Sequence, residues 1–111
     1  MCIRDRTDPD AIRLPFFHRN VDYDEVIFYH RGEFMSRAGI GPGMVTFHPS
    51  GLHHGPQPAA RARDTAAVAD GPRFADEVAV MVDARHALHA GPAAPTCEIA
   101  GYVDSWRPSP S

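Results

Sequence analysis

The chain has 111 residues, so it is one small domain or a piece of a larger one. Hydrophobic residues make up 43% of it and charged residues 23%, which favours a folded globular protein over a disordered one. A net charge of −3 gives no electrostatic reason to expect nucleic acid or an anionic membrane as a partner. The polar N-terminal ten residues, the lack of a long apolar run and the presence of only two cysteines predict a cytoplasmic protein.

We expect both ends of the chain to lie outside the folded domain. Residues 1–6, Met-Cys-Ile-Arg-Asp-Arg, resemble the translated end of a common sequencing-library adapter. We therefore expect these residues to be non-native and the natural protein to have lost an upstream part. Residues 107–111 are expected to be a frayed tail. The domain itself is expected to span residues 7–106.

After a loop-like start, short β-branched and aromatic runs alternate with Gly and Pro turns, which predicts a series of strands. The expected strands are residues 25–30, 33–36 (the return of a hairpin), 44–48, 77–83 and 97–103. Residues 59–69 are rich in Ala and Arg and predict a short helix or a mobile loop. The sequence therefore predicts an all-β fold, a partial jelly-roll β-sandwich with at most one short helix. Five strands are fewer than the roughly eight of a closed jelly roll, which fits a lost upstream part.

Side chains that can bind a metal stand at fixed distances from glycines and a proline. The two spacings are His18-x-Asn20-x4-Glu25-x6-Gly32 and Gly43-x5-Pro49-x-Gly51-x2-His54. They resemble the two motifs of the cupin superfamily. The chain departs from those motifs because Asn20 replaces the second His, Pro58 replaces the last Asn, and the opening Gly of the first motif is absent.

The replacement by Asn20 leaves two imidazoles and one carboxylate, from His18, Glu25 and His54. This donor set is typical of non-haem Fe(II) oxygenases, because it leaves open positions on the metal for substrate and O2. A single His in a loop is more often a solvated residue, and Glu25 alone would be an ordinary edge charge. Their joint agreement with the motif spacing predicts an Fe(II) site formed by the three residues.

The segments Pro15–Asn20 and Leu52–Pro56 resemble homogentisate 1,2-dioxygenases, and the resemblance extends over residues 11–106. In that family the iron is held by the His of His-Arg-Asn, by the following Glu and by the His of His-Gly-Pro. The resemblance thus implies the same ligands, with Asp24 as a rival to the Glu. It also implies the C-terminal metal-binding fragment of a bacterial-type member. The reaction would be ring opening of homogentisate by O2 to maleylacetoacetate, in tyrosine and phenylalanine catabolism.

Other residues receive roles mainly from this resemblance. His48 lies six residues before His54, as a family active-site His does, so it would face the substrate; otherwise it is an outward strand-end residue. Phe34 stands where the family has an active-site Tyr, which puts that contact in doubt.

Three further residues lie beside the expected ligands. Arg19 would pair with a carboxylate of the substrate or brace a neighbouring Asp. Asn20 would orient the loop that carries His18 by backbone hydrogen bonds. His53, next to His54, would donate a hydrogen bond behind the ligands.

The acid–base His of the family lies in an upstream segment that this chain does not contain, so we expect the fragment alone to be inactive. The expected partners are homogentisate and O2, and a homo-oligomer, a hexamer by family analogy. Two alternatives remain open. A cupin isomerase or epimerase would use the same metal cage, but such enzymes more often retain the His that is Asn20 here. A native start near Thr7 would favour a non-enzymatic, small-molecule-binding cupin.

Overall fold

In the computed structural model, the described residues are 16–34, 37–67, 76–92 and 97–107. The expected adapter residues, the start of the upstream loop and nearly all of the expected tail lie outside these ranges. Our expectations for those segments therefore stay predictions.

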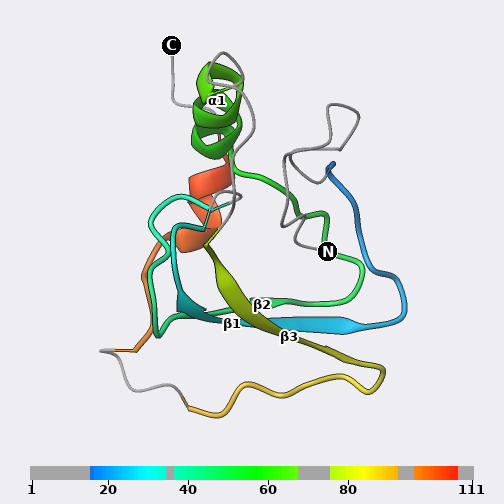
Figure 1. Cartoon of the computed structure of the whole chain (residues 1–111). Coiled ribbons are helices and arrows are strands. Elements are labelled where there is room, and N and C mark those ends of the chain that lie inside the picture. The colour runs from blue at the N-terminus through cyan, green and yellow to red at the C-terminus, as the bar shows by residue number, and fades with distance from the viewer. Residues whose placement is uncertain (1–15, 35–36, 68–75, 93–96, 108–111) are drawn as a thin grey trace.

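Three antiparallel strands form one sheet in the order β2-β1-β3 (Figure 1). They are β1 (Asp24–Arg31), β2 (Val45–His48) and β3 (Val78–Ala84). Val, Ile, Phe, Tyr and Thr are frequent in these strands, because branched and aromatic side chains pack well on a pleated surface. The strands predicted at residues 25–30, 44–48 and 77–83 are confirmed, and each boundary differs by at most one residue.

The predicted hairpin return at residues 33–36 is wrong for Glu33 and Phe34, which form no strand, and the rest of it lies outside the described residues. Gly32 turns the chain with a φ of 93°. A Cβ atom there would lie 2.7 Å from the carbonyl oxygen of Asp76 and 2.7 Å from Cα of Glu77. Only glycine tolerates both the dihedral angle and this close approach. The residues after the turn therefore leave the sheet, and β3 takes the position beside β1.

The predicted strand at residues 97–103 is also wrong within the described part of this segment. The chain forms turns and then the 3-10 helix η2 (Tyr102–Trp106). The backbone at Gly101, with a φ of 74°, lies in the left-handed region and ends any extended run. By contrast, the predicted helix is confirmed over α1 (Pro58–Ala67), which begins at a proline as many helices do.

The two faces of the sheet differ in what covers them. Alternate residues of β1 point to opposite faces. On the inner face Ile27 and Tyr29 pack with Phe34 in a small buried core, and Glu25 lies on this face as well. The outer face carries apolar side chains that are 39–58% exposed: Phe28, Val45, Phe47, Val80 and Val82. Because Glu25 is a buried carboxylate at one end of this mainly apolar inner face, a functional site is expected there.

The predicted fold class is confirmed. The described residues form one antiparallel sheet and one short α-helix, which lies away from the sheet in Figure 1, and this agrees with a partial cupin fold. Within the same residues, no helix has the length and apolar character to cross a membrane.

Candidate metal centre

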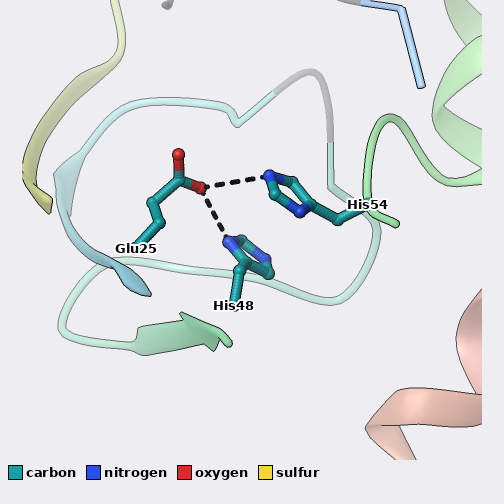
Figure 2. A group of neighbouring side chains, drawn as sticks. All are labelled: Glu25, His48 and His54. Carbon is teal, nitrogen blue, oxygen red and sulfur yellow. Dashed lines mark hydrogen bonds and ion pairs between the residues drawn. The ribbon is translucent and has the colours of Figure 1, made fainter. Parts of the chain in front are cut away.

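Glu25 and His48 face each other across the β1–β2 pair. Their Cα atoms are direct partners in the antiparallel register, so both side chains project from the same face of the sheet with their Cβ atoms about 5 Å apart. The His48 Nδ1 atom lies 2.7 Å from Oε1 of Glu25 (Figure 2). Both residues are buried. The sheet register thus determines the contact between this carboxylate and this imidazole.

His18 and His54 lie in two loops that are joined by one isolated antiparallel β-bridge between these two residues. Each donates its backbone N–H to the carbonyl of the other, at 3.0 and 2.9 Å. The Nδ1–H of His18 donates to the carbonyl of Phe16 at 2.8 Å, and that of His54 donates to the carbonyl of Leu52 at 3.0 Å. Both imidazoles therefore keep Nε2 available, and a backbone carbonyl that fixes the other nitrogen is a common support for a metal-binding His.

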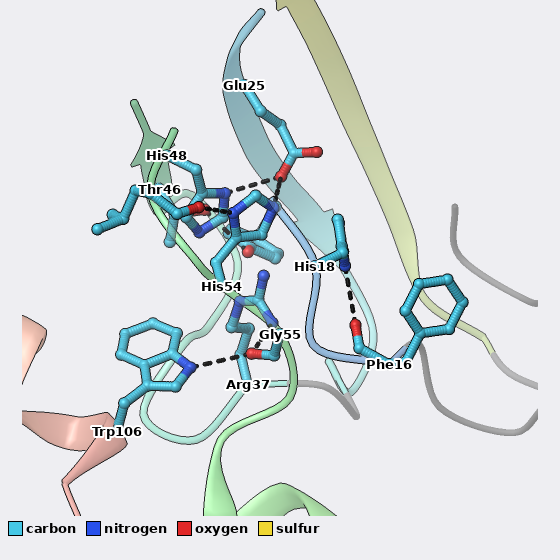
Figure 3. Close-up of polar contacts among 11 residues, drawn as sticks. Phe16, His18, Glu25, Arg37, Thr46, His48, His54, Gly55 and Trp106 are labelled. Atoms are coloured by element: carbon cyan, nitrogen blue, oxygen red, sulfur yellow. Dashed lines mark hydrogen bonds and ion pairs between the residues drawn. The ribbon is translucent and has the colours of Figure 1, made fainter. Parts of the chain in front are cut away.

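The side chains from the sheet and from the loops meet in one cluster. Ligand atoms of Glu25, His48 and His54 all lie within 4.8 Å of one another, and Nε2 of His54 is 3.7 Å from Oε1 of Glu25. The ring of His54 stacks on His48 with centroids 4.5 Å apart, and the ring of His18 lies edge-on to His54 at 4.5 Å. Figure 3 shows the four side chains together. The structure thus groups two of the predicted ligands, Glu25 and His54, with His48, and the predicted ligand His18 contacts this group through the ring of His54.

The charge states of the cluster suit a cation. The hydrogen bond from His48, partly opposed by burial, lowers the pKa of Glu25 below its usual value. Burial lowers the pKa of His54, because it disfavours the charged imidazolium. At neutral pH the cluster therefore contains an ionised carboxylate next to a neutral imidazole, which are the forms that bind metals.

Two nitrogen atoms in the cluster show whether its residues fit a metal ion. Nε2 of His48 and Nε2 of His54 are buried and have no hydrogen-bond partner within the described residues. Since Nδ1–H of each ring is already donating, these Nε2 atoms carry lone pairs, and leaving such groups unpaired costs about 1–3 kcal/mol each. A divalent metal ion bound beside the Glu25 carboxylate would satisfy Nε2 of His54, which lies 3.7 Å from Oε1 of Glu25. The residues therefore fit a metal site with nitrogen and oxygen donors.

Asp24, the rival to Glu25, is held elsewhere. Its Oδ1 accepts the backbone N–H of Ser50 and its Oδ2 accepts that of Leu88, both at 2.7 Å. These two bonds lower the pKa of Asp24. Asp24 therefore ties the loops after β2 and β3 to the start of β1, and the carboxylate of the cluster is that of Glu25.

The remaining predicted residues surround the cluster at different depths. Arg19 and His53 are exposed. The carbonyl of Asn20 accepts the backbone N–H of Gly51 at 2.7 Å, which ties the loop of His18 to the loop that leads to His54. Phe34 lies in the core, edge-on to Tyr29 with ring centroids 4.6 Å apart.

Comparison with known proteins gives one decisive match. The family described as "Homogentisate 1,2-dioxygenase C-terminal" matches residues 3–110. The chain belongs to this family. The resemblance inferred from His-Arg-Asn, the following Glu and His-Gly-Pro is therefore confirmed.

A curated relative agrees with membership of the homogentisate 1,2-dioxygenase C-terminal family. The chain is 37% identical over 101 residues to "Putative dioxygenase SSO1533" of Saccharolobus solfataricus strain P2. This alignment covers 91% of the chain but only 26% of that relative, so the chain spans about a quarter of the relative's length. No solved structure matches the chain. The description of the family and the name of the relative both refer to a dioxygenase.

Sequence reasoning missed the residues that hold the segment after His54 in this family member. Residues 54–57 are buried, and Gln57 is fully enclosed although it is polar. The Gln57 side chain donates to Oγ of Ser105 at 2.6 Å and accepts the backbone N–H of Ala38. The cupin spacing names none of these residues, and the sequence carries no other signal for them, because the contacts join segments far apart in the chain.

Proposed function

We propose that this chain supplies the metal ligands of an Fe(II)-dependent ring-cleaving dioxygenase that converts homogentisate and O2 to maleylacetoacetate, in tyrosine and phenylalanine catabolism. The observation that carries the proposal is the buried Glu25 carboxylate beside His54, whose Nε2 lies 3.7 Å away and has no hydrogen-bond partner within the described residues. Family membership supports it. Imidazole nitrogen with one carboxylate oxygen is the donor set that suits Fe(II) oxygenases.

The ligands that we propose are His18, Glu25 and His54. His18 and His54 share the same local arrangement, in which Nδ1–H donates to the carbonyl two residues earlier and Nε2 is left available. His48 differs, because its Nδ1–H donates to Glu25 itself. In this assignment His48 orients the carboxylate and borders the substrate. The competing set replaces His18 by His48, whose ligand atom is closer to the other two.

The residues of the site imply the kind of substrate. When bound, a divalent ion would hold both reactants and polarise oxygen. Among the described residues the cluster contains one carboxylate, that of Glu25, so a bound divalent ion would leave a net positive charge, which favours an anionic aromatic acid such as homogentisate. Arg19 is exposed and carries a further positive charge next to His18, where it would pair with the carboxylate of the substrate.

Completion of the site by the rest of the protein is part of the proposal. The acid–base His that the family resemblance implies would come from an upstream segment, so the chain alone is expected to be inactive. We expect the full-length protein to be a homo-oligomer, a hexamer by family analogy.

Oxygen uptake by the iron-loaded full-length protein tests the proposal. We expect faster turnover of homogentisate than of gentisate, which is one methylene shorter. A methylene in a fitted pocket is worth about 1–3 kcal/mol, or roughly 10- to 200-fold in kcat/KM. Faster turnover of gentisate would remove homogentisate as the substrate and leave a ring-cleaving dioxygenase. No uptake with either compound would favour a cupin isomerase or epimerase, or a cupin that only binds small molecules.

A further inference from the structure

The carbonyl oxygen of Gly55, the residue after His54, accepts two side-chain hydrogen bonds. Nη1 of Arg37 donates to it at 3.0 Å, and Nε1 of Trp106 donates to it at 3.0 Å. Figure 3 shows Arg37 and Trp106 beside this carbonyl. Since a carbonyl oxygen has two lone pairs, the two donors use its full capacity.

Both donors are themselves held in place. Arg37 is only 6% exposed, and its guanidinium carbon lies 5.8 Å from the centre of the Trp106 ring, within the range of a cation–π contact. Trp106 lies edge-on to Tyr102 with ring centroids 5.2 Å apart. The guanidinium and the indole therefore form one packed unit, and their N–H groups are presented to the carbonyl in a fixed direction.

A second contact joins η2 to the same segment. Ser105, the residue before Trp106, accepts the side-chain N–H of Gln57 at 2.6 Å. The chain from His54 to Gln57 is thus held at two points by one short helix. On its other side, the His54 backbone is paired with His18. The segment is fixed on both sides of the imidazole that the proposed metal site uses.

We propose that Arg37 and Trp106 are positioning residues, which set the affinity and geometry of the metal site by holding His54 through the carbonyl of Gly55. Both side chains donate to the same backbone carbonyl, next to His54 in the chain. This carbonyl belongs to the Gly55–Pro56 peptide, one peptide unit beyond His54, so a shift of this segment would carry Nε2 of His54 away from Glu25. The inference rests on the proposed metal site and adds to it residues that lie outside the cupin motifs.

The test is Co(II) titration of the full-length protein, followed by visible absorption, in Trp106→Phe. This change removes the Nε1–H donor and keeps an aromatic ring near Arg37. Tyr102→Phe is the matched control, because it removes a polar group from the same aromatic pair, and the Tyr102 hydroxyl has no hydrogen-bond partner within the described residues. Arg37→Lys is a second variant in case Trp106→Phe does not fold.

Loss of a group that orients a metal ligand typically lowers metal affinity by about 10- to 100-fold. We expect such a loss in Trp106→Phe, together with a shift of the Co(II) absorption bands at saturation, and neither effect in Tyr102→Phe. Equal losses in both variants, an unchanged Trp106→Phe, or a lower affinity with an unchanged spectrum would each overturn the positioning role. If the wild-type protein binds no Co(II), or binds it no more tightly than His54→Ala does, the proposed metal site is wrong.

Discussion

His18 and His54 each donate a backbone N–H to the carbonyl of the other, so two loops that are 36 residues apart in sequence present their imidazoles side by side. Gly55 permits this pairing. A Cβ atom on Gly55 would lie 3.0 Å from Cα and 3.2 Å from Cγ of Phe17, the residue before His18. The glycine after the second His therefore has a packing reason: a larger residue would push the two loops apart.

Gly55→Ala should weaken metal binding. The new methyl group meets backbone as well as a ring, so the loops must shift by a few tenths of an ångström and the two imidazoles separate. We expect Co(II) affinity to fall about 10-fold or more, in line with the effect of disturbing the groups that orient ligands. Gly91→Ala is the control, since a Cβ there meets nothing within 4 Å. The same affinity for both variants and the wild type would contradict the packing role.

Gly32→Ala should lower the free energy of unfolding by more than the cost of placing alanine in a left-handed conformation. Forcing a non-glycine residue into such a conformation costs about 1–3 kcal/mol, and the Cβ would also clash with the backbone at Asp76 and Glu77. Gly43 has a φ of 87° and open space around its Cβ position, so Gly43→Ala measures the strain without the clash. Urea unfolding of both variants should show the larger loss for Gly32→Ala. Equal losses of unfolding free energy in the two variants would mean that the close approach of Asp76 and Glu77 to Gly32 adds no steric cost.

The sequence predicted the strands better than the arrangement of the strands. Residues 25–30 are rich in β-branched and aromatic side chains and residues 77–83 contain three valines, and this local preference is sufficient to identify both strands. Glu33 and Phe34 form no hairpin return because Gly32 directs the chain past Asp76, a contact between residues far apart in sequence. The segment at 97–103 fails because Gly101 adopts the left-handed conformation before η2.

The candidate site was similarly predictable only in part. The spacing of His18, Glu25 and His54 is visible in the sequence, and the structure places Glu25 near His54 and the ring of His18 against that of His54. The contact of His48 with Glu25 depends on the register of β1 and β2, which the sequence does not specify. For the same reason Arg37 and Trp106 could not be found, since they reach Gly55 only in the folded chain.

Ionisation of Tyr102 should lower the free energy of unfolding above pH 10. Burial raises the pKa of its hydroxyl from 10.0 to about 12. The unfolded chain loses this proton first, so the stabilising contribution is fully present below pH 10 and is lost as the pH rises from about 10 to 12. The difference in tyrosinate absorption between the wild type and Tyr102→Phe should rise with pH, with a midpoint near pH 12. A midpoint at 10 would show that the Tyr102 hydroxyl is not desolvated in the folded chain.

The 111-residue chain expressed alone should associate. The outer face of the sheet exposes Val80 and Val82 at more than half of their surface, and β3 ends the sheet with an unpaired edge in the described residues. Replacing both by Thr keeps the β-branched shape and removes apolar surface, so sedimentation should show less association. Val103→Thr is the control, because Val103 is 75% exposed but lies on η2. A wild-type chain that stays monomeric with one sharp thermal transition would contradict this prediction.

The most direct measurement of the central claim is X-ray absorption at the metal edge, which counts the imidazole ligands of Fe(II) in the full-length protein. The proposed site of His18, Glu25 and His54 predicts two imidazoles in the wild type. It also predicts two in His48→Ala, where the carboxylate loses its hydrogen bond, and one in His18→Ala. Two imidazoles in His18→Ala and one in His48→Ala would contradict the assignment and place His48 on the metal instead.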